Sequence, residues 1–437
     1  MMGQCMGRVT FVLAAGLAVS ACMGPGWSRD EAVSRAAPGA PASGLRAARD
    51  EATESRIIDT LMSRQSALPD GGAFDTVADA VLAANSRAAE SGLRSARLRA
   101  QAAARNWLPT LGPKVSLSSL SEVVTQLVVD QVLFGAGRKK AERAFAKADV
   151  EVAAVTLAQD TNQRVFTALT LYLDAQKARE KAALAARSEA DMARFEWVMN
   201  ERVKGGISNS SDLNVLRQKL SEIRAQKQAR TEAAAAALAE LNAMAIRPLD
   251  DVSGLSVLRV AARGPDPLAV MLAEAEKLRS VEAARIERAG YMPRVSANAV
   301  LGDTGSGPSL TMITDQPLGL GTGASLQAIA AQAQAAGRKV DQAREDANRR
   351  LRRLEAQGSA LARQASEASA LTDAAKRNLD VFQAQYDAGQ RQVMDVVGVY
   401  EAYARQQEAQ VDLTFDAVRT QLEIARDLGL LADGDRI

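Results

Sequence analysis

The sequence between Gly137 and Gly205 reads RKKAERAFAKADVEVAAVTLAQDTNQRVFTALTLYLDAQKAREKAALAARSEADMARFEWVMNERVK, and these residues, 138–204, include neither glycine nor proline. Because those two residues are the usual helix breakers, the run predicts one continuous helix. At 1.5 Å per residue, such a helix would be about 100 Å long, which no compact domain needs. The stretch therefore predicts an elongated, mainly helical protein.

Heptad spacing predicts that the neighbouring helices pack as coiled coils. Leucine and isoleucine step by 3, 4 and 3 residues after the glycines near Gly205. A second seam, close to the C-terminus, steps by 4, 3, 4 and 3. Such steps place the apolar side chains on one helix face. The two seams are Leu213, Leu216, Leu220 and Ile223, and Val411, Phe415, Val418, Leu422 and Ala425. Glycines near Gly205 and Gly389 are expected to fold each long helix back on itself.

Composition argues against catalysis and against nucleic-acid binding. The 437 residues carry a net charge of only +2, without the basic excess of a nucleic-acid partner. Histidine is absent, which excludes His-based triads and His-ligated metals. The only cysteines, Cys5 and Cys22, lie near the N-terminus. We expect no catalytic residues, metal site or cofactor, and no enzyme activity, although a hydrolase that uses carboxylates alone is conceivable.

The N-terminus has the features of an export signal. Residues 1–21 combine a basic start with a short apolar run, which predicts a signal peptide. The small residues before Cys22 resemble a lipobox, in which that cysteine is lipidated; ordinary cleavage before Cys22 is the alternative. Residues 22–72 are expected to form the lipidated N-terminus and a flexible tether. No later segment approaches 18 continuous apolar residues, so any membrane crossing would have to use strands.

The sequence repeats itself at an offset of 183 to 185 residues. Asn106–Pro109 corresponds to Gly290–Pro293, Asp130–Leu133 to Asp315–Leu318, and Gly206–Asp212 to Gly389–Asp395. Three matches in one order indicate a duplication. The predicted parts are a first structural repeat at 73–246, a linker at 247–267, a second structural repeat at 268–431 and a C-terminal tail at 432–437.

Each half is expected to contain a helix of roughly 30 residues that leads to Pro109 or Pro293, followed by two short strands. The expected strands are Lys114–Ser118, Thr125–Phe134, Arg294–Leu301 and Ser309–Leu318. Their alternation suits tilted membrane strands, and a pair of soluble hairpins is the alternative. Four strands cannot close a membrane barrel, so at least two copies would have to share one.

Over roughly residues 75–431, the chain resembles the TolC-like outer-membrane efflux protein family. The motifs that carry the resemblance are Leu108-Pro109, Asp130–Arg138, the Tyr-x-x-Gly-x-Arg-x-x-x-Asp-Val string of 386–396, and Asp427–Leu431. The resemblance implies a homotrimer with a 12-stranded β-barrel above a periplasmic α-barrel. It also implies contact with outer-membrane lipid, a periplasmic adaptor (membrane fusion) protein and an inner-membrane pump of RND or ABC type.

The resemblance further implies a periplasmic gate. Tyr386 and Arg391 would bond to Asp212 and Ser211, and Asp395 would form an acidic constriction. Gly398 departs from the family, some of whose members carry a second aspartate there. The alternative is that Asp212 and Asp395 only cap the helices that follow each turn. The adaptor-docking tips would be Gly205, Gly206, Ile207, Ala388, Gly389 and Gln390, whose glycines could also serve only a left-handed turn.

The sequence therefore predicts an outer-membrane export channel with a large periplasmic portion, which expels small molecules or secretes polypeptides. The alternative is a structural coiled-coil lipoprotein that spans the periplasm without a pore. The paired hairpins at matched places favour the channel, because a spacer needs none.

Overall fold

The computed structural model describes residues 55–84, 88–119, 122–256, 258, 260, 264–302 and 307–436. Residues 41–437 form one compact unit, to which this description applies. The predicted signal peptide, Cys22 and the start of the tether lie outside the described residues. In the described ranges, no helix combines the length and the hydropathy that crossing a membrane requires.

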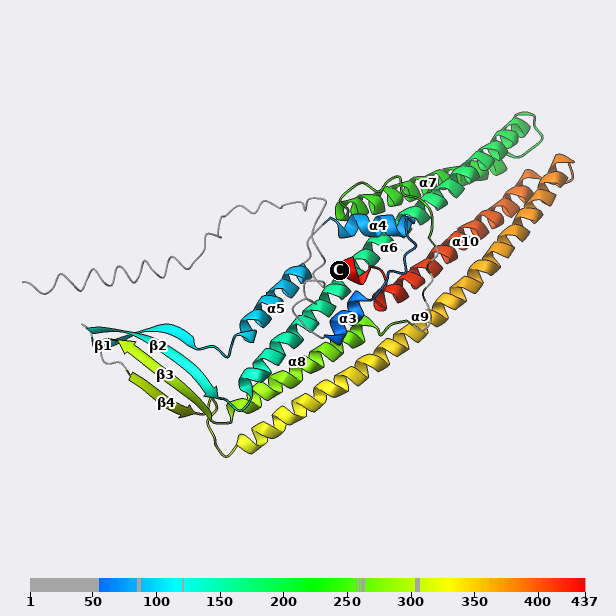
Figure 1. Ribbon diagram of the computed structural model, residues 1–437. Coiled ribbons are helices and arrows are strands. Elements are labelled where there is room, and N and C mark those ends of the chain that lie inside the picture. The colour runs from blue at the N-terminus through cyan, green and yellow to red at the C-terminus, as the bar shows by residue number, and fades with distance from the viewer. Residues whose placement is uncertain are drawn as a thin grey trace, which may run out of the picture. The chain divides into compact units, whose positions relative to one another are not determined.

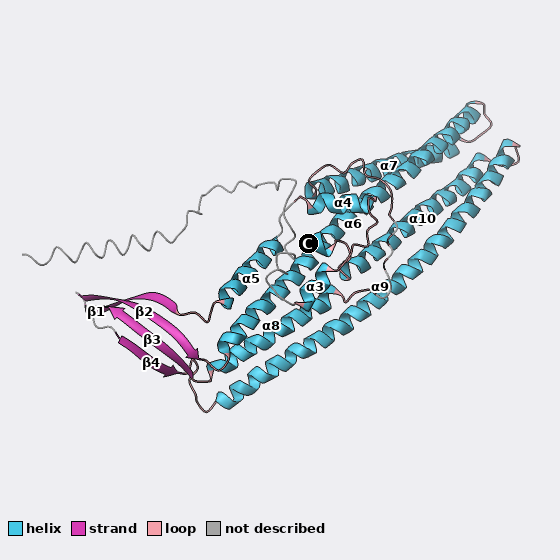
Figure 2. Ribbon diagram, in the orientation of Figure 1, coloured by secondary structure: helices cyan, strands magenta, loops and turns pink. Residues whose placement is uncertain are grey.

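The unit is mainly helical, with one small sheet, as the sequence predicts (Figures 1 and 2). Its elements are α3 (Arg56–Met62), α4 (Ala73–Leu82), α5 (Ala88–Ala104), β1 (Thr110–Ser119), β2 (Glu122–Phe134), α6 (Arg138–Lys204), α7 (Ser210–Met244), α8 (Leu268–Gly290), β3 (Arg294–Gly302), β4 (Gly307–Ile313), α9 (Thr322–Asp387), α10 (Val393–Asp427) and the 3-10 helix η1 (Gly434–Arg436). Each half contains two strands followed by a long helical hairpin, so the duplicated plan is confirmed.

The predicted long helix is confirmed. Helix α6 runs without interruption for 67 residues, begins after Gly137 and ends at Lys204, directly before Gly205. Its counterpart in the second half, α9, has 66 residues. The expected helix before each strand pair is shorter than predicted, with 17 residues in α5 and 23 in α8. In the first half, the remaining apolar residues of the predicted helix belong to a separate helix, α4.

The long helices lie side by side in one layer. Helix α6 packs against α5 and α7 on one side and against α8 and α10 on the other, and α9 packs against α8 and α10 (Figure 1). The edges of the layer are therefore α5 and α7 at one side and α9 at the other. Both predicted heptad seams face into this layer: Leu216 of α7 and Leu422 of α10 are fully buried.

The four strands form one antiparallel sheet in the order β1-β2-β3-β4. Strand β2 pairs with β3 in a register that sets Leu127 opposite Leu301. Strand β4 ends at Ile313, before the predicted end at Leu318. Pro317 has no N–H for a ladder, and the Gln316 N–H donates to the Gly290 carbonyl oxygen at 2.9 Å instead.

The structure differs from the expected tether at residues 55–72. This segment contains α3, whose Ile58 and Leu61 are buried in the core. The Ser55 hydroxyl caps α3 by accepting from the Ile58 N–H at 3.3 Å. A helix of two turns is too short to give a clear periodicity, so its burial was not evident from the sequence. The C-terminal tail also packs, since the Gly434 N–H donates to the Arg64 carbonyl oxygen at 2.9 Å.

Candidate functional site

The turn between α6 and α7 is built by two glycines. Gly205 caps α6, and Gly206 adopts a left-handed conformation with φ +73°. The Ile207 N–H donates to the Arg202 carbonyl oxygen at 2.8 Å, and the Gly206 N–H to the Val203 carbonyl oxygen at 3.0 Å. This pair of bonds is a Schellman motif, which satisfies carbonyl groups at the helix end.

The turn between α9 and α10 has the same construction. Gly389 has φ +77° and follows the capping residue Ala388. The Gln390 N–H donates to the Gln385 carbonyl oxygen and the Gly389 N–H to the Tyr386 carbonyl oxygen, each at 2.9 Å. Glycine is needed at both left-handed positions because a side chain would strain them. The turn role of these glycines is confirmed.

All six residues predicted as docking tips are exposed. Ile207 is the largest apolar side chain among them, and 71% of its surface is accessible. An isoleucine this open at the end of a hairpin is an available contact for another protein. The docking role itself stays a prediction.

The acidic residues after the turns occupy helix starts. Gln392 and Asp395 form a capping box at the start of α10, in which the Gln392 N–H donates to Asp395 Oδ2 at 3.3 Å. At α7, the cap is Asn209, whose side chain accepts from the Ser211 N–H at 3.1 Å. Asp212 lies in the first turn of α7, where a carboxylate faces the positive end of the helix dipole. The capping alternative is therefore confirmed for Asp395.

Arg391 contacts its own hairpin in the protomer. Its Nε donates to Gln385 Oε1 at 3.1 Å, and its guanidinium lies 4.6 Å from the centre of the Phe382 ring. Among the described residues, no hydrogen bond or ion pair joins Arg391 or Tyr386 to Asp212. Arg391 is exposed and so remains accessible from outside the protomer. The gate stays a prediction.

An apolar cluster behind the turns fixes them relative to each other. This turn cluster draws buried residues from α6, α7, α9 and α10, so each hairpin end packs on the other. Its members are Met192, Phe195, Met199, Leu213, Leu216, Leu220, Leu379, Val393, Val396, Val397 and Tyr400. The predicted gate and tip residues therefore lie beside one shared apolar core.

Tyr400 is a polar anchor inside the turn cluster. Its hydroxyl donates to Asp191 Oδ2 at 2.8 Å and lies 3.3 Å from Ser188 Oγ, which joins α10 to α6. Burial raises the pKa of Tyr400, so the hydroxyl keeps its proton and remains a donor.

Farther along the same helix pair, ion pairs join α6 to α10. Lys181 Nζ lies 2.6 Å from the Asp412 carboxylate, and Lys177 Nζ lies 2.8 Å from Asp412 and 3.3 Å from Asp416. Burial opposes ionisation of Asp412, but hydrogen bonds from both lysines hold its pKa below the usual value. Sequence analysis did not single out these residues; the four-residue spacing of each pair was the available signal.

The sheet has one apolar and one polar face. Leu310 and Met312 of β4 share the apolar face with Leu111 of β1, and they are 73%, 70% and 67% exposed. On the other face, the Asn298 side chain donates to Thr311 Oγ1 at 2.8 Å. Large exposed apolar side chains on one face of a sheet indicate a surface that another apolar phase covers.

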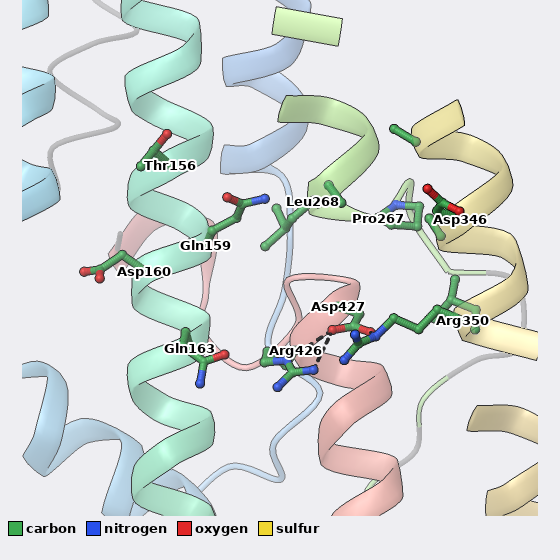
Figure 3. A pocket seen from close by; sticks show the side chains of 14 residues that line it. Thr156, Gln159, Asp160, Gln163, Pro267, Leu268, Asp346, Arg350, Arg426 and Asp427 are labelled. Carbon is green, nitrogen blue, oxygen red and sulfur yellow. Dashed lines mark hydrogen bonds and ion pairs between the residues drawn. The ribbon is translucent and has the colours of Figure 1, made fainter. Parts of the chain in front are cut away.

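A cavity of about 860 Å³ lies where α8 begins and α10 ends, between α6 and α9 (Figure 3). Its charged groups are largely paired: Asp427 accepts from Arg350 at 2.5 Å and from Arg426 at 2.9 Å. In the part of the chain that the structure describes, no group of three or more acidic or thiol side chains is placed to hold a metal. The cavity presents no pairing of a nucleophile with a base.

Comparison with known proteins identifies the architecture. No protein-family model and no curated protein sequence matches the chain. Among solved structures, its fold is that of TolC-like outer-membrane channels, so the resemblance is confirmed at the level of the fold.

The individual matches are distant in sequence. A membrane protein from Pseudomonas aeruginosa is 17% identical, with a TM-score of 0.72 over 94% of this chain and 98% of that one. The outer membrane protein VceC from Vibrio cholerae is 15% identical, with a TM-score of 0.69 over 82% and 96%. The open state of the MtrE outer membrane channel from Neisseria gonorrhoeae is 16% identical, with a TM-score of 0.65 over 87% and 94%.

Proposed function

We propose that this chain is one protomer of a trimeric outer-membrane export channel, and that it is not an enzyme. The observation that carries the proposal is the exposed apolar face of the sheet, at the end of a helical layer with two open edges. Lipid would cover the apolar face of the sheet, and further copies of the chain would cover the open edges of the helical layer. The shared fold with solved outer-membrane channels supports this reading.

The strand number supports the trimer. Four strands per protomer leave the edges of β1 and β4 open, which lipid does not tolerate. Three copies supply twelve strands, enough for a closed barrel with Leu310 and Met312 toward lipid and Asn298 toward the lumen. The helical layers would continue as a periplasmic α-barrel. The export signal and lipidation of Cys22 would place and anchor the protomer in the outer membrane.

The two hairpin turns would face the periplasm and dock an adaptor protein, which links the duct to an inner-membrane pump of RND or ABC type. Ile207 and its five companion tip residues are the proposed contacts. The cargo would be small molecules or polypeptides. In this proposal, Arg391 exchanges its contacts with Gln385 and Phe382 for bonds to Ser211 and Asp212. Tyr386 bonds to the same residues, and together these bonds keep the periplasmic gate closed.

The proposed role of Asp395 follows from its position. Its carboxylate caps α10 and lies exposed beside the turn, so three copies would place three negative charges around one opening. Such a ring attracts cations and repels anions. The capping bond to Gln392 would hold each carboxylate in place rather than compete with that role.

Single-channel conductance in planar bilayers tests the proposal. The wild type is compared with Arg391→Ala and with the control Arg352→Ala, whose side chain is 86% exposed on α9 and far from the turns. We expect small cation-preferring currents that grow in Arg391→Ala only. Equal currents in all three proteins would support the channel but reject the role of Arg391 in the gate. Folded protein without any current would favour the alternative, a periplasm-spanning structural lipoprotein.

A further inference from the structure

Cationic side chains gather where the helices meet the sheet (Figure 1). This level includes the connections to the strands and the two adjoining turns, about 11 Å, of α5, α6, α8 and α9. It comprises residues 98–109, 135–144, 284–293 and 314–328, which contain eight cationic and three anionic residues. The whole chain has a net charge of only +2. Positive charge is therefore concentrated beside the sheet.

Most of these cations have no partner in the protomer. Two of the three anionic residues are already engaged, since Arg138 pairs with Glu142 at 3.0 Å and also with Asp315. Five cations form no hydrogen bond or ion pair with other described residues, and four of the five are exposed. We call them the basic collar: Arg99, Arg105, Lys140, Arg143 and Arg288.

Two collar residues lie where the dipole of their own helix opposes them. Lys140 and Arg143 belong to the first two turns of α6, whose first turn has three cations and no acidic residue. Positive charge is unfavourable there, because the free N–H groups of a helix start already carry partial positive charge. The equivalent helix of the second half, α9, begins with sixteen uncharged residues, 322–337. The fold does not need these cations, so they indicate an anionic partner outside the protomer.

Lys140 lies on the side of α6 that carries α3. It precedes Glu151 by eleven residues, close to three full turns, so the two side chains share one helix face. The Glu151 carboxylate accepts from Ser55 Oγ at 2.6 Å, at the start of α3. In the proposed channel, an additional helix on the inner side of the layer would obstruct the bore. The side of α3, and with it Lys140, would therefore face outward.

The apolar face of the sheet ends beside the collar. Phe134, the last residue of β2, is 60% exposed and belongs to this face, because it pairs with Val295, which lies opposite Met312. Trp107, two residues after Arg105, is also 60% exposed, and tryptophan is typical of the boundary between lipid chains and headgroups. Headgroups fill about 5–8 Å beyond the hydrocarbon core. Lipid on the apolar face would thus bring its phosphates to the level of the collar.

We propose that the basic collar binds the phosphate groups of anionic phospholipids in the periplasmic leaflet of the outer membrane. Arginine and lysine donate charge-assisted hydrogen bonds to phosphate oxygens. Anionic lipids are preferred to zwitterionic ones, because the cationic group of a zwitterionic headgroup is repelled by the unpaired collar residues. The inference rests on the proposed function, because it requires lipid on the apolar face of the sheet.

Quenching of Trp107 fluorescence by brominated lipids tests the preference in the full-length protein. The chain has three tryptophans, so Trp27→Phe with Trp197→Phe leaves Trp107 as the reporter beside the collar. Vesicles contain equal amounts of phosphatidylglycerol and phosphatidylcholine, and only one of the two lipids is brominated. We expect phosphatidylglycerol to occupy the sites near Trp107 with a preference of about fivefold. Equal quenching by the two lipids would overturn the proposal.

Substitutions then assign the preference to the collar. Lys140→Gln with Arg143→Gln should remove most of it, whereas Lys140→Arg with Arg143→Lys keeps the charge and should preserve it. The matched control, Arg349→Gln with Arg352→Gln, removes the same charge from side chains that are 71% and 86% exposed, about 40 Å along α9. A preference that survives in Lys140→Gln/Arg143→Gln, or that the control loses equally, would contradict the role of the collar.

Conductance of the same preparations separates this proposal from the channel. Currents without a preference for phosphatidylglycerol, or without any quenching, reject the basic collar alone. A collar-dependent preference without currents supports the lipid site and rejects the channel. A folded protein that shows neither quenching nor currents rejects both.

Discussion

The Arg64 guanidinium donates from Nη1 to the Leu428 carbonyl oxygen at 2.6 Å, so a residue that precedes the first repeat closes the last turn of α10. Its Nη2 donates to the Asp266 carbonyl oxygen at 2.7 Å, in the linker between the repeats. Arg64 is buried, which lowers its pKa to about 10, and it stays charged at neutral pH. One side chain therefore ties together the start, the middle and the end of the described chain.

Replacement of Arg64 should destabilise the protomer. Arg64→Leu leaves the buried Leu428 carbonyl group without this donor, which costs about 1–3 kcal/mol, and also removes the partly buried bond to the Asp266 carbonyl oxygen. Arg64→Lys should lose less, since a lysine can still reach one of them. Thermal unfolding at fixed protein concentration measures the change, with the exposed Arg99→Leu on α5 as the control. An Arg64→Leu midpoint equal to that of the control would contradict the role of Arg64.

Gly429 should not tolerate a side chain. Its φ is +66°, and an added Cβ would lie 2.5 Å from Arg64 Nη1 and 2.9 Å from Leu268 Cγ. Gly429→Ala should cost about 2–4 kcal/mol from backbone strain and crowding. Gly398→Ala is the matched control, because Gly398 lies within α10 with open space at its Cβ position. There alanine should raise stability by about 0.5–1 kcal/mol, and urea unfolding distinguishes the two outcomes.

Tyr172 should make the fold sensitive to alkali. Burial raises its pKa to about 12, although Arg179 opposes the shift. Because the folded value exceeds the unfolded value of about 10, the contribution of Tyr172 is complete below pH 10 and is lost as pH rises toward 12. In Tyr172→Phe, the unfolding midpoint should fall less steeply between pH 9 and 12. The lost bond to the Gly254 carbonyl oxygen, 2.8 Å long, should lower the free energy of unfolding by about 1 kcal/mol at pH 7. Parallel slopes for both proteins would argue against this account.

The two faces of β4 should respond differently to a charge. Leu310 belongs to the exposed apolar face and its neighbour Ser309 to the polar face. If lipid covers the apolar face, Leu310→Lys costs about 2–4 kcal/mol of membrane stability, whereas Ser309→Lys is tolerated. The fraction of folded oligomer in outer-membrane preparations measures this. Equal assembly of both variants would mean that the Leu310 side does not face lipid.

Local patterns in the sequence predicted much of the fold. A run without glycine or proline predicted α6 with its observed ends, and heptad steps predicted which faces of α7 and α10 are buried. The spacing from Gly206 and Gly389 to the following aspartates predicted two equivalent turns. All of these depend on residues within a few positions of one another.

What the sequence did not reveal depends on distant partners. Arg64 bonds to carbonyl groups 202 and 364 positions away, and nothing near it indicates burial. The Gln385 and Phe382 contacts of Arg391 depend on side-chain rotamers, which a motif does not specify. The end of β4 depends on a carbonyl group of α8 that captures Gln316. Packing between remote segments decides each of these features.

The open edges of the sheet have a consequence for biogenesis. Strands β1 and β4 each pair on one side only, so a solitary protomer exposes two rows of backbone donors and acceptors. Such edges are templates for pairing with any other extended chain. If the chain is exported and assembles as proposed, the interval between these two steps is the most hazardous period for it, and a holding factor that covers β1 or β4 would protect it then.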